Sequence, residues 1–178
     1  MKYENGPQTP SPSTIRVLFI CHGNICRSPM AEFYFKNLVE KAGLCDRFEI
    51  ESAATSSEEV WNGVGNPINP PAADVLKYND IGQTPYTDYR KKRARQVTKK
   101  DYAKYDYFIG MDRWNIRNLT VLFGGDPEKK VHMLLDYTGI YSREVADPWY
   151  TNDYEMAFSD IKEGCDAFFE YLKKKGKM

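Results

Sequence analysis

Apolar residues along the chain fall into short continuous runs that alternate with stretches of helical spacing. The run over 17–20 is Val-Leu-Phe-Ile, which is typical of a strand buried on both faces. From Met30 on, apolar residues recur at helical spacing as far as Gly43, a residue suited to a helix C-cap. The same patterns predict strands over 48–54, 105–111 and 130–134, and helices over 69–78, 98–104, 114–123 and 155–174.

This alternation of strands and helices indicates an α/β fold. We expect a single-domain three-layer sandwich, in which a four-stranded parallel sheet carries helices on both faces. The domain is expected over 15–178, after a flexible polar segment over 1–14 that contains three prolines. Ligand sites of such sheets lie beyond the carboxyl ends of the strands, and Cys21 directly follows the first strand.

Composition and charge narrow the range of partners. The chain has 25 Lys and Arg residues against 25 Asp and Glu residues, so its net charge does not favour nucleic acid. It has no continuous apolar stretch of membrane-spanning length, and its polar beginning does not resemble a signal peptide. Four cysteines, two of them in one loop, suit a reducing compartment. We therefore expect a soluble cytoplasmic protein without a membrane span.

The loop between the first strand and the first helix carries the candidate chemistry. Residues 21–29 read Cys-His-Gly-Asn-Ile-Cys-Arg-Ser-Pro, with Ser28 as the expected N-cap and Pro29 as the first helical residue. Backbone N–H groups of such a loop and helix start point toward one place, which binds an oxyanion.

Cys21 and Arg27 add a nucleophile and a clamp to this anion site. A thiol that faces a helix N-terminus and a guanidinium is ionised at neutral pH, and the thiolate is the reactive form. The planar fork of arginine grips two phosphate oxygens in parallel. The pair predicts phosphoryl transfer through a cysteinyl-phosphate.

Other interpretations of the loop fit less well. A nucleotide-binding phosphate loop needs a second glycine followed by lysine, and neither is present. Zinc is disfavoured because four residues separate Cys21 from Cys26, while Cys45 and Cys165 stand alone. We therefore expect no metal and no cofactor. An inert core cysteine remains the plain structural alternative for Cys21.

The loop resembles the signature Cys-x-Gly-Asn-x-Cys-Arg-Ser-Pro of the low-molecular-weight protein tyrosine phosphatases. The similarity continues, in the family's order, through Ala31-Glu32, the Glu-Ser-Ala-Ala-Thr-Ser block over 51–56, the block over 61–65, Ala94-Arg95-Gln96, Met111-Asp112 and Asp147-Pro148-Trp149-Tyr150. The resemblance implies an enzyme that hydrolyses phosphotyrosine in proteins or peptides, with Cys21 as nucleophile and Arg27 on the phosphate.

Such an enzyme needs a general acid for the leaving phenol, and two Asp-Pro pairs compete for this role. Asp126 stands among glycines and lysines, as in a solvated turn. Asp147 precedes Trp149 and Tyr150, whose rings can desolvate the carboxyl and favour its protonated form. We choose Asp147, and the resemblance points to the same residue.

Several loop residues are expected to support the nucleophile. Ser28 can donate a hydrogen bond to the Cys21 sulfur. Asn24 is expected in a left-handed turn, which asparagine tolerates better than most residues. The resemblance ties Asn24 to Ser52 and to a histidine, but the position of that histidine is Lys92 here. We expect Lys92 to point to solvent, with water or Ser52 completing the network.

The other loop residues have simpler expected roles. His22 is expected to contribute its backbone amide, and Gly23 belongs to the phosphate-binding loop. Cys26 suggests a regulatory hypothesis, a reversible disulfide with Cys21 under peroxide, against the plain alternative of a packed small side chain. By resemblance, the aliphatic Ile25 favours phosphotyrosine over phosphoarginine.

The resemblance places Trp61, Trp149 and Tyr150 around the substrate ring, and an aromatic slot prefers phosphotyrosine to the shorter phosphoserine. Three rival functions remain. A thiol-dependent arsenate reductase needs two further cysteines toward the C-terminal half, where Cys165 stands alone. A protein arginine phosphatase is the second rival. A phosphotyrosine-binding module, the third, would require loss of the nucleophile or the acid.

Overall fold

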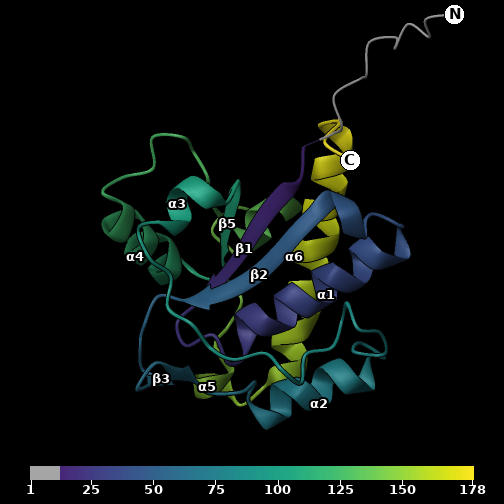
Figure 1. The fold of residues 1–178 in the computed structure, drawn as a ribbon, viewed down its shortest axis with the longest axis vertical. Helices are drawn as coiled ribbons and strands as arrows, with labels where there is room; N and C mark the ends of the chain where they lie inside the picture. The colour runs from purple at the N-terminus through teal and green to yellow at the C-terminus, as the bar shows by residue number, and fades with distance from the viewer. Residues whose placement is uncertain (1–12) are drawn as a thin grey trace, which may run out of the picture.

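A four-stranded parallel sheet forms the centre of the computed structural model, which describes residues 13–178 (Figure 1). In spatial order its strands are β2 (Phe48–Ala54), β1 (Ile15–Cys21), β5 (Tyr107–Gly110) and β6 (Val131–Met133). The parallel register pairs Cys21 with Ala54 and Ile20 with Gly110. The carboxyl ends of β2, β1 and β5 therefore meet at one edge, where the loop that begins at Cys21 leaves the sheet.

Helices cover both faces of the sheet. Alternate residues of β1 point to opposite faces, and since both sets are apolar, each face must be covered. Val17 and Phe19 belong to one buried cluster, whereas Leu18 and Ile20 belong to another. The first cluster involves α1 (Arg27–Lys41), α2 (Pro70–Tyr78), α6 (Tyr154–Lys174) and the 3-10 helix η2 (Leu134–Thr138). The second involves α3 (Asp101–Lys104) and α4 (Arg113–Phe123). The expected α/β three-layer sandwich is confirmed.

Several helices and strands begin or end at other residues than the sequence pattern predicts. Helix α1 begins at Arg27 with Cys26 as its N-cap residue, so the expected N-cap role of Ser28 is wrong. The Ser28 hydroxyl instead faces the sulfur of Cys21. The strands expected over 105–111 and 130–134 are shorter in the structure, at Tyr107–Gly110 and Val131–Met133.

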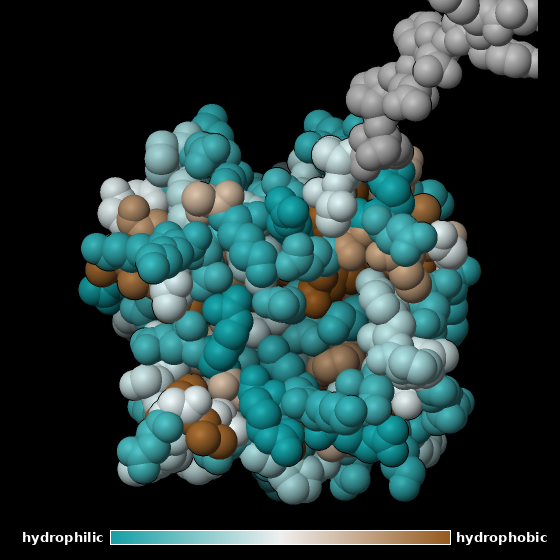
Figure 2. Space-filling view, in the orientation of Figure 1, coloured by the Kyte–Doolittle hydropathy of each residue, from teal (hydrophilic) through white to brown (hydrophobic). Residues whose placement is uncertain are grey.

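Five short elements were not expected from the pattern: η1 (Cys45–Arg47), β3 (Val60–Trp61), β4 (Val64–Gly65), η2 and α5 (Pro148–Thr151). The surface in Figure 2 is mostly hydrophilic, with a small hydrophobic patch over the β3–β4 hairpin, where Val64 is exposed. Within residues 13–178, no helix is both long and apolar enough to cross a membrane. Most of the segment expected to be flexible, residues 1–12, lies outside the described residues.

Candidate active site

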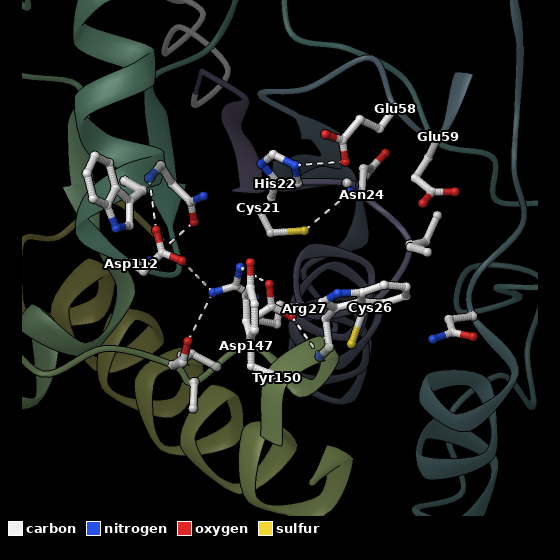
Figure 3. A pocket seen from close by; sticks show the side chains of 18 of the residues that line it. Cys21, His22, Asn24, Cys26, Arg27, Glu58, Glu59, Asp112, Asp147 and Tyr150 are labelled. Atoms are coloured by element: carbon white, nitrogen blue, oxygen red, sulfur yellow. Dashed lines mark hydrogen bonds and ion pairs between the residues drawn. The ribbon is translucent and has the colours of Figure 1, made fainter. Parts of the chain in front are cut away.

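A cleft of about 740 Å³ opens at the carboxyl ends of β1 and β5 (Figure 3). The whole loop over 21–27 lines it, together with the start of α4 and the segment over 144–150. The rim also carries the carboxylates of Glu58, Glu59 and Glu144. The topology therefore brings the cysteine loop and the Asp-Pro-Trp-Tyr segment, which are more than 100 residues apart in sequence, into one cleft.

Cys21 is the last residue of β1, and it is 3% exposed. Its Sγ lies 3.0 Å from the Ser28 hydroxyl oxygen and 3.3 Å from the backbone nitrogen of Asn24, which donates to it. Two polar groups thus converge on the sulfur from the loop and from the first turn of α1.

Asn24 adopts the expected left-handed conformation, with φ at 60°. Its Oδ1 accepts a hydrogen bond from the backbone nitrogen of Arg95 at 3.1 Å. Its Nδ2 donates to Ser28 at 2.9 Å and to Ser52 at 2.8 Å. These three partners come from different segments, and together they fix the loop in a backbone conformation that most residues avoid.

Arg27 opens α1 and is 2% exposed. Its Nη1 donates to Asp112 at 2.7 Å and to the Val145 carbonyl at 3.0 Å, and its Nη2 lies 3.3 Å from Asp147. Burial lowers the pKa of the Arg27 guanidinium, but the facing charges of Cys21 and the two carboxylates raise it by more. Arg27 is therefore a charged, oriented side chain beside the sulfur.

Asp147 is the N-cap residue of α5, where one carboxyl oxygen accepts from the Trp149 backbone nitrogen at 3.0 Å. The other oxygen contacts Arg27. Trp149 and Tyr150 line the mouth of the cleft but are 81% and 85% exposed. The Asp147 side chain is itself 28% exposed, and its desolvation by these rings stays a prediction.

Asp126, the competing Asp-Pro residue, lies outside the cleft lining. Its carboxyl accepts from the Tyr102 hydroxyl and from two backbone nitrogens, those of Lys130 and Val131. Burial raises the pKa of Asp126, but these hydrogen bonds lower it by more. Asp126 stabilises the turn before β6, as its sequence context indicates.

Other loop residues take distinct places. His22 contacts Glu58 at 3.0 Å through its ring, a contact that the sequence interpretation of this residue did not include. Gly23 faces Glu59, whose Cγ would lie 3.2 Å from an added Cβ. Burial raises the pKa of the Cys26 thiol well above its ordinary value, so this second cysteine stays protonated.

Lys92 does not point to solvent, and this part of the sequence interpretation is wrong. Its side chain is 13% exposed, donates to the Ser52 carbonyl at 2.9 Å and pairs with Glu32 at 3.1 Å. Ser52 in turn donates its hydroxyl to Glu32 at 2.7 Å. The lysine is drawn inward because Glu32 is a buried carboxylate that requires a cationic partner.

Three residues near the loop lie elsewhere, or contribute more, than the sequence pattern indicates. Trp61 lies on β3, is 71% exposed and is not among the residues that line the cleft, so the geometry does not support its expected contact with substrate. Trp114 lines the cleft from α4, although the sequence interpretation used it only as a helix start. Asp112 is the partner of Arg27, and the resemblance alone assigns it no role. Its position after an expected parallel strand was an available signal for the site.

A cysteine and an arginine in one loop at the carboxyl end of a parallel strand, with a carboxylate beside them, form the arrangement of a cysteine-dependent phosphatase. Residues 16–178 match the model of the family described as "Low molecular weight phosphotyrosine protein phosphatase", and the chain belongs to this family. It is accordingly a phosphoric monoester hydrolase of the protein tyrosine phosphatase type.

Individual relatives agree with this assignment over nearly their full length. The low molecular weight protein-tyrosine-phosphatase YfkJ of Bacillus subtilis is 35% identical over 161 residues, 90% of this chain and 97% of that protein. Its crystal structure matches with a TM-score of 0.83 over 92% of this chain and 97% of that chain. The low molecular weight phosphotyrosine protein phosphatase of Sus scrofa is 35% identical over 90% of this chain and 97% of its own length. A Drosophila arginine phosphatase structure matches at 26% identity, with a TM-score of 0.76 and coverage of 89% of this chain and 98% of that one.

Proposed function

We propose that the protein hydrolyses phosphotyrosine in proteins or peptides, with Cys21 as the nucleophile that carries the phosphoryl group. The observation that carries this proposal is the convergence on one cleft of the Cys21 sulfur, the Arg27 guanidinium and the Asp147 carboxyl. The sulfur also accepts a hydrogen bond from the Asn24 backbone nitrogen and faces the Ser28 hydroxyl.

In the first step, the Cys21 sulfur attacks phosphorus, and the S–P bond forms as the bond to the phenol oxygen breaks. Arg27 and the backbone N–H groups of the loop over 22–27 stabilise the equatorial oxygens. Asp147 gives its proton to the leaving phenol oxygen. In the second step, the Asp147 carboxylate takes a proton from water, the water oxygen attacks phosphorus, and the Cys21 thiolate leaves with the electron pair of the S–P bond.

Three observations favour phosphotyrosine over phosphoarginine. Relatives whose names state tyrosine phosphatase activity are 35% identical, whereas the arginine phosphatase structure is 26% identical. Ile25, an aliphatic residue, lines the cleft. Trp149 and Tyr150 stand at its mouth, where their faces can contact a phenyl ring.

We also propose a catalytic domain over 15–178 and a cytoplasmic location. The location is supported by the thiol chemistry, because a reducing compartment keeps a thiolate nucleophile active. A reversible disulfide between Cys21 and Cys26 stays a hypothesis. It is supported by the position of both cysteines in the lining of the same cleft. It predicts that a Cys26→Ser variant recovers less activity after peroxide treatment than the parent does.

The function is tested with phosphotyrosine, phosphoserine and phosphoarginine peptides and four proteins: the parent, Cys21→Ser, Asp147→Ala and Asp126→Ala. We expect phosphotyrosine to be the preferred substrate, no turnover by Cys21→Ser, and kcat about 10² lower in Asp147→Ala. Asp126→Ala is the matched control, because it removes the other Asp-Pro carboxyl outside the cleft, and it should keep the parent kcat. A preference for phosphoarginine would overturn the substrate, and equal kcat in the two Asp→Ala variants would overturn the general acid.

A further inference from the structure

A buried charged cluster supports the cysteine loop, and none of its members lines the cleft. Its centre is Glu32 of α1, which is 2% exposed. One carboxyl oxygen of Glu32 pairs with Lys92 at 3.1 Å and accepts from the Ser52 hydroxyl at 2.7 Å. The other accepts from Lys36 at 2.8 Å. A buried carboxylate with two cationic partners and a hydroxyl donor is a fully paired group.

The charge on Glu32 sets the direction of the hydrogen bond that it shares with Ser52. Burial raises the pKa of the Glu32 carboxyl, but Lys92, Lys36 and the hydrogen bonds lower it by more, so the group is an anion. An ionised carboxylate only accepts hydrogen bonds, and Ser52 must therefore donate its single hydroxyl hydrogen to it. The Ser52 oxygen is then left as an acceptor, and it faces the Asn24 amide nitrogen at 2.8 Å.

The same reasoning continues from Asn24 to the sulfur. The Arg95 backbone nitrogen can only donate, so it fixes the Asn24 carbonyl oxygen on its side. The two amide hydrogens of Asn24 consequently go to Ser52 and Ser28. Ser28 accepts from Asn24, which leaves its own hydroxyl hydrogen to be donated to the Cys21 sulfur 3.0 Å away.

We propose that Lys92 and Glu32 are positioning residues. Their buried ion pair keeps the Ser52 oxygen as the acceptor of one Asn24 amide hydrogen, and this contact, added to the one from the Arg95 backbone, holds the Asn24 side chain where its other amide hydrogen reaches Ser28. The Ser28 hydroxyl thereby stays a donor to the Cys21 sulfur. Lys92 also holds the Ser52 backbone directly, by donating to its carbonyl at 2.9 Å. The proposal rests on the proposed role of Cys21 as nucleophile. It assigns a function to Lys92, which stands at a position where the resemblance has a histidine.

The test compares the parent protein with Lys92→Met, Glu32→Gln and Lys92→Arg. Lys92→Met removes the charge and both contacts, Glu32→Gln keeps the shape but not the charge, and Lys92→Arg keeps a cation and a donor. Lys92→Met alone leaves the Glu32 carboxylate buried without its lysine partner. The double variant Lys92→Met/Glu32→Gln avoids this, because it removes both charges of the pair. Val39→Ala is the matched control, since it removes buried methyl groups from α1 and Val39 takes no part in the hydrogen bonds and ion pairs of the cluster.

The first measurement is the rate at which iodoacetamide alkylates Cys21 as a function of pH, with Cys21→Ser as background. Burial raises the pKa of the Cys26 and Cys165 thiols, so these cysteines react little at neutral pH. We expect the pH of half-maximal alkylation to rise by about 0.5 to 1 unit in Lys92→Met and Glu32→Gln, as for one weakened hydrogen bond. Lys92→Arg and Val39→Ala should keep the parent profile.

The second measurement is turnover of a phosphotyrosine peptide. We expect kcat to fall about 10-fold in Lys92→Met while KM changes less than about twofold, because the lysine does not line the cleft. If Lys92→Met and Glu32→Gln match Val39→Ala in both measurements, the positioning role is wrong. The alkylation profile needs no substrate, so an enzyme inactive on phosphotyrosine would refute the proposed function without touching this inference.

Discussion

Asn24 shows how a single side chain holds a loop whose backbone is otherwise unfavourable. A non-glycine residue at φ 60° costs about 1–2 kcal/mol, although asparagine is among the residues that bear it best. Its side chain repays this cost through hydrogen bonds to Ser28, Ser52 and the Arg95 backbone. The backbone nitrogen of the same residue donates to the Cys21 sulfur, so loop conformation and nucleophile are joined at this position.

Two substitutions of Asn24 separate its backbone role from its side-chain role. Both Asn24→Ala and Asn24→Gly lose the side-chain contacts, but only glycine adopts a positive φ without strain. We expect the free energy of unfolding of Asn24→Gly, measured with urea, to be about 1 kcal/mol higher than that of Asn24→Ala. Both variants should lose at least about 10-fold in kcat, because Ser28 and Ser52 lose the donor that orients them. Parent-like turnover by Asn24→Gly would mean that the side-chain contacts are dispensable.

Among the elements, the short β3–β4 hairpin packs unusually closely against the segment that carries Lys92 and Arg95. Gly65 of β4 lies so near the backbone of Ala94 that an added Cβ would sit 1.8 Å from its carbonyl oxygen. The Ala94 backbone nitrogen also donates to the Asn66 carbonyl at 2.9 Å. The hairpin therefore holds in place the segment that supports Asn24 from behind.

Gly65→Ala is expected to displace this segment, because neither backbone can give way to the new methyl group. We expect the free energy of unfolding to fall by at least about 2 kcal/mol, with a further loss of kcat. Gly63→Ala, in the same hairpin, is the matched control. Its Cβ would meet nothing within 4 Å, so the substitution should cost only the strain of its φ of 77°, about 1–2 kcal/mol. Equal stability of the two variants, measured by urea unfolding, would contradict the close approach.

At the scale of the whole molecule, the fold buries charge at the meeting point of three segments. Helix α1 supplies Glu32, strand β2 supplies Ser52, and the chain before α3 supplies Lys92. The folded protein holds the pKa of Glu32 below its ordinary value. Its carboxylate consequently contributes stability above the ordinary pKa of glutamate, about 4.3, and that contribution is lost as pH falls through the lower, folded value.

The acid limb of the stability curve should therefore depend on Glu32. We expect the free energy of unfolding of the parent to decrease as pH falls below about 4. Glu32→Gln should be less stable than the parent at pH about 7 and should lose less on acidification, since its amide does not titrate. Other carboxylates with lowered pKa values, such as Glu49 and Glu163, are unchanged in the variant and act as an internal reference. Parallel acid limbs in the two proteins, followed by urea unfolding at several pH values, would show that Glu32 is not the group responsible.

The sequence by itself determined the class of fold, the loop and the family, because these depend on local pattern. The run over 17–20, the nine residues that begin at Cys21 and the alternation of strands and helices can be interpreted without knowing which segments meet. Asn24 in a left-handed turn also followed from local preference, and the structure has it at φ 60°.

Which distant groups face one another depends instead on how the chain packs in three dimensions. The tertiary structure brought Asp112 and Asp147 to Arg27, left Trp61 outside the cleft lining and turned Lys92 inward. The lysine looked solvated in a run of basic residues, since nothing local signals that a carboxylate from α1 lies buried behind it. Burial and pairing of charges depend on how layers pack, and the free energy of an unpaired buried charge, several kcal/mol, outweighs any local preference of the side chain for water.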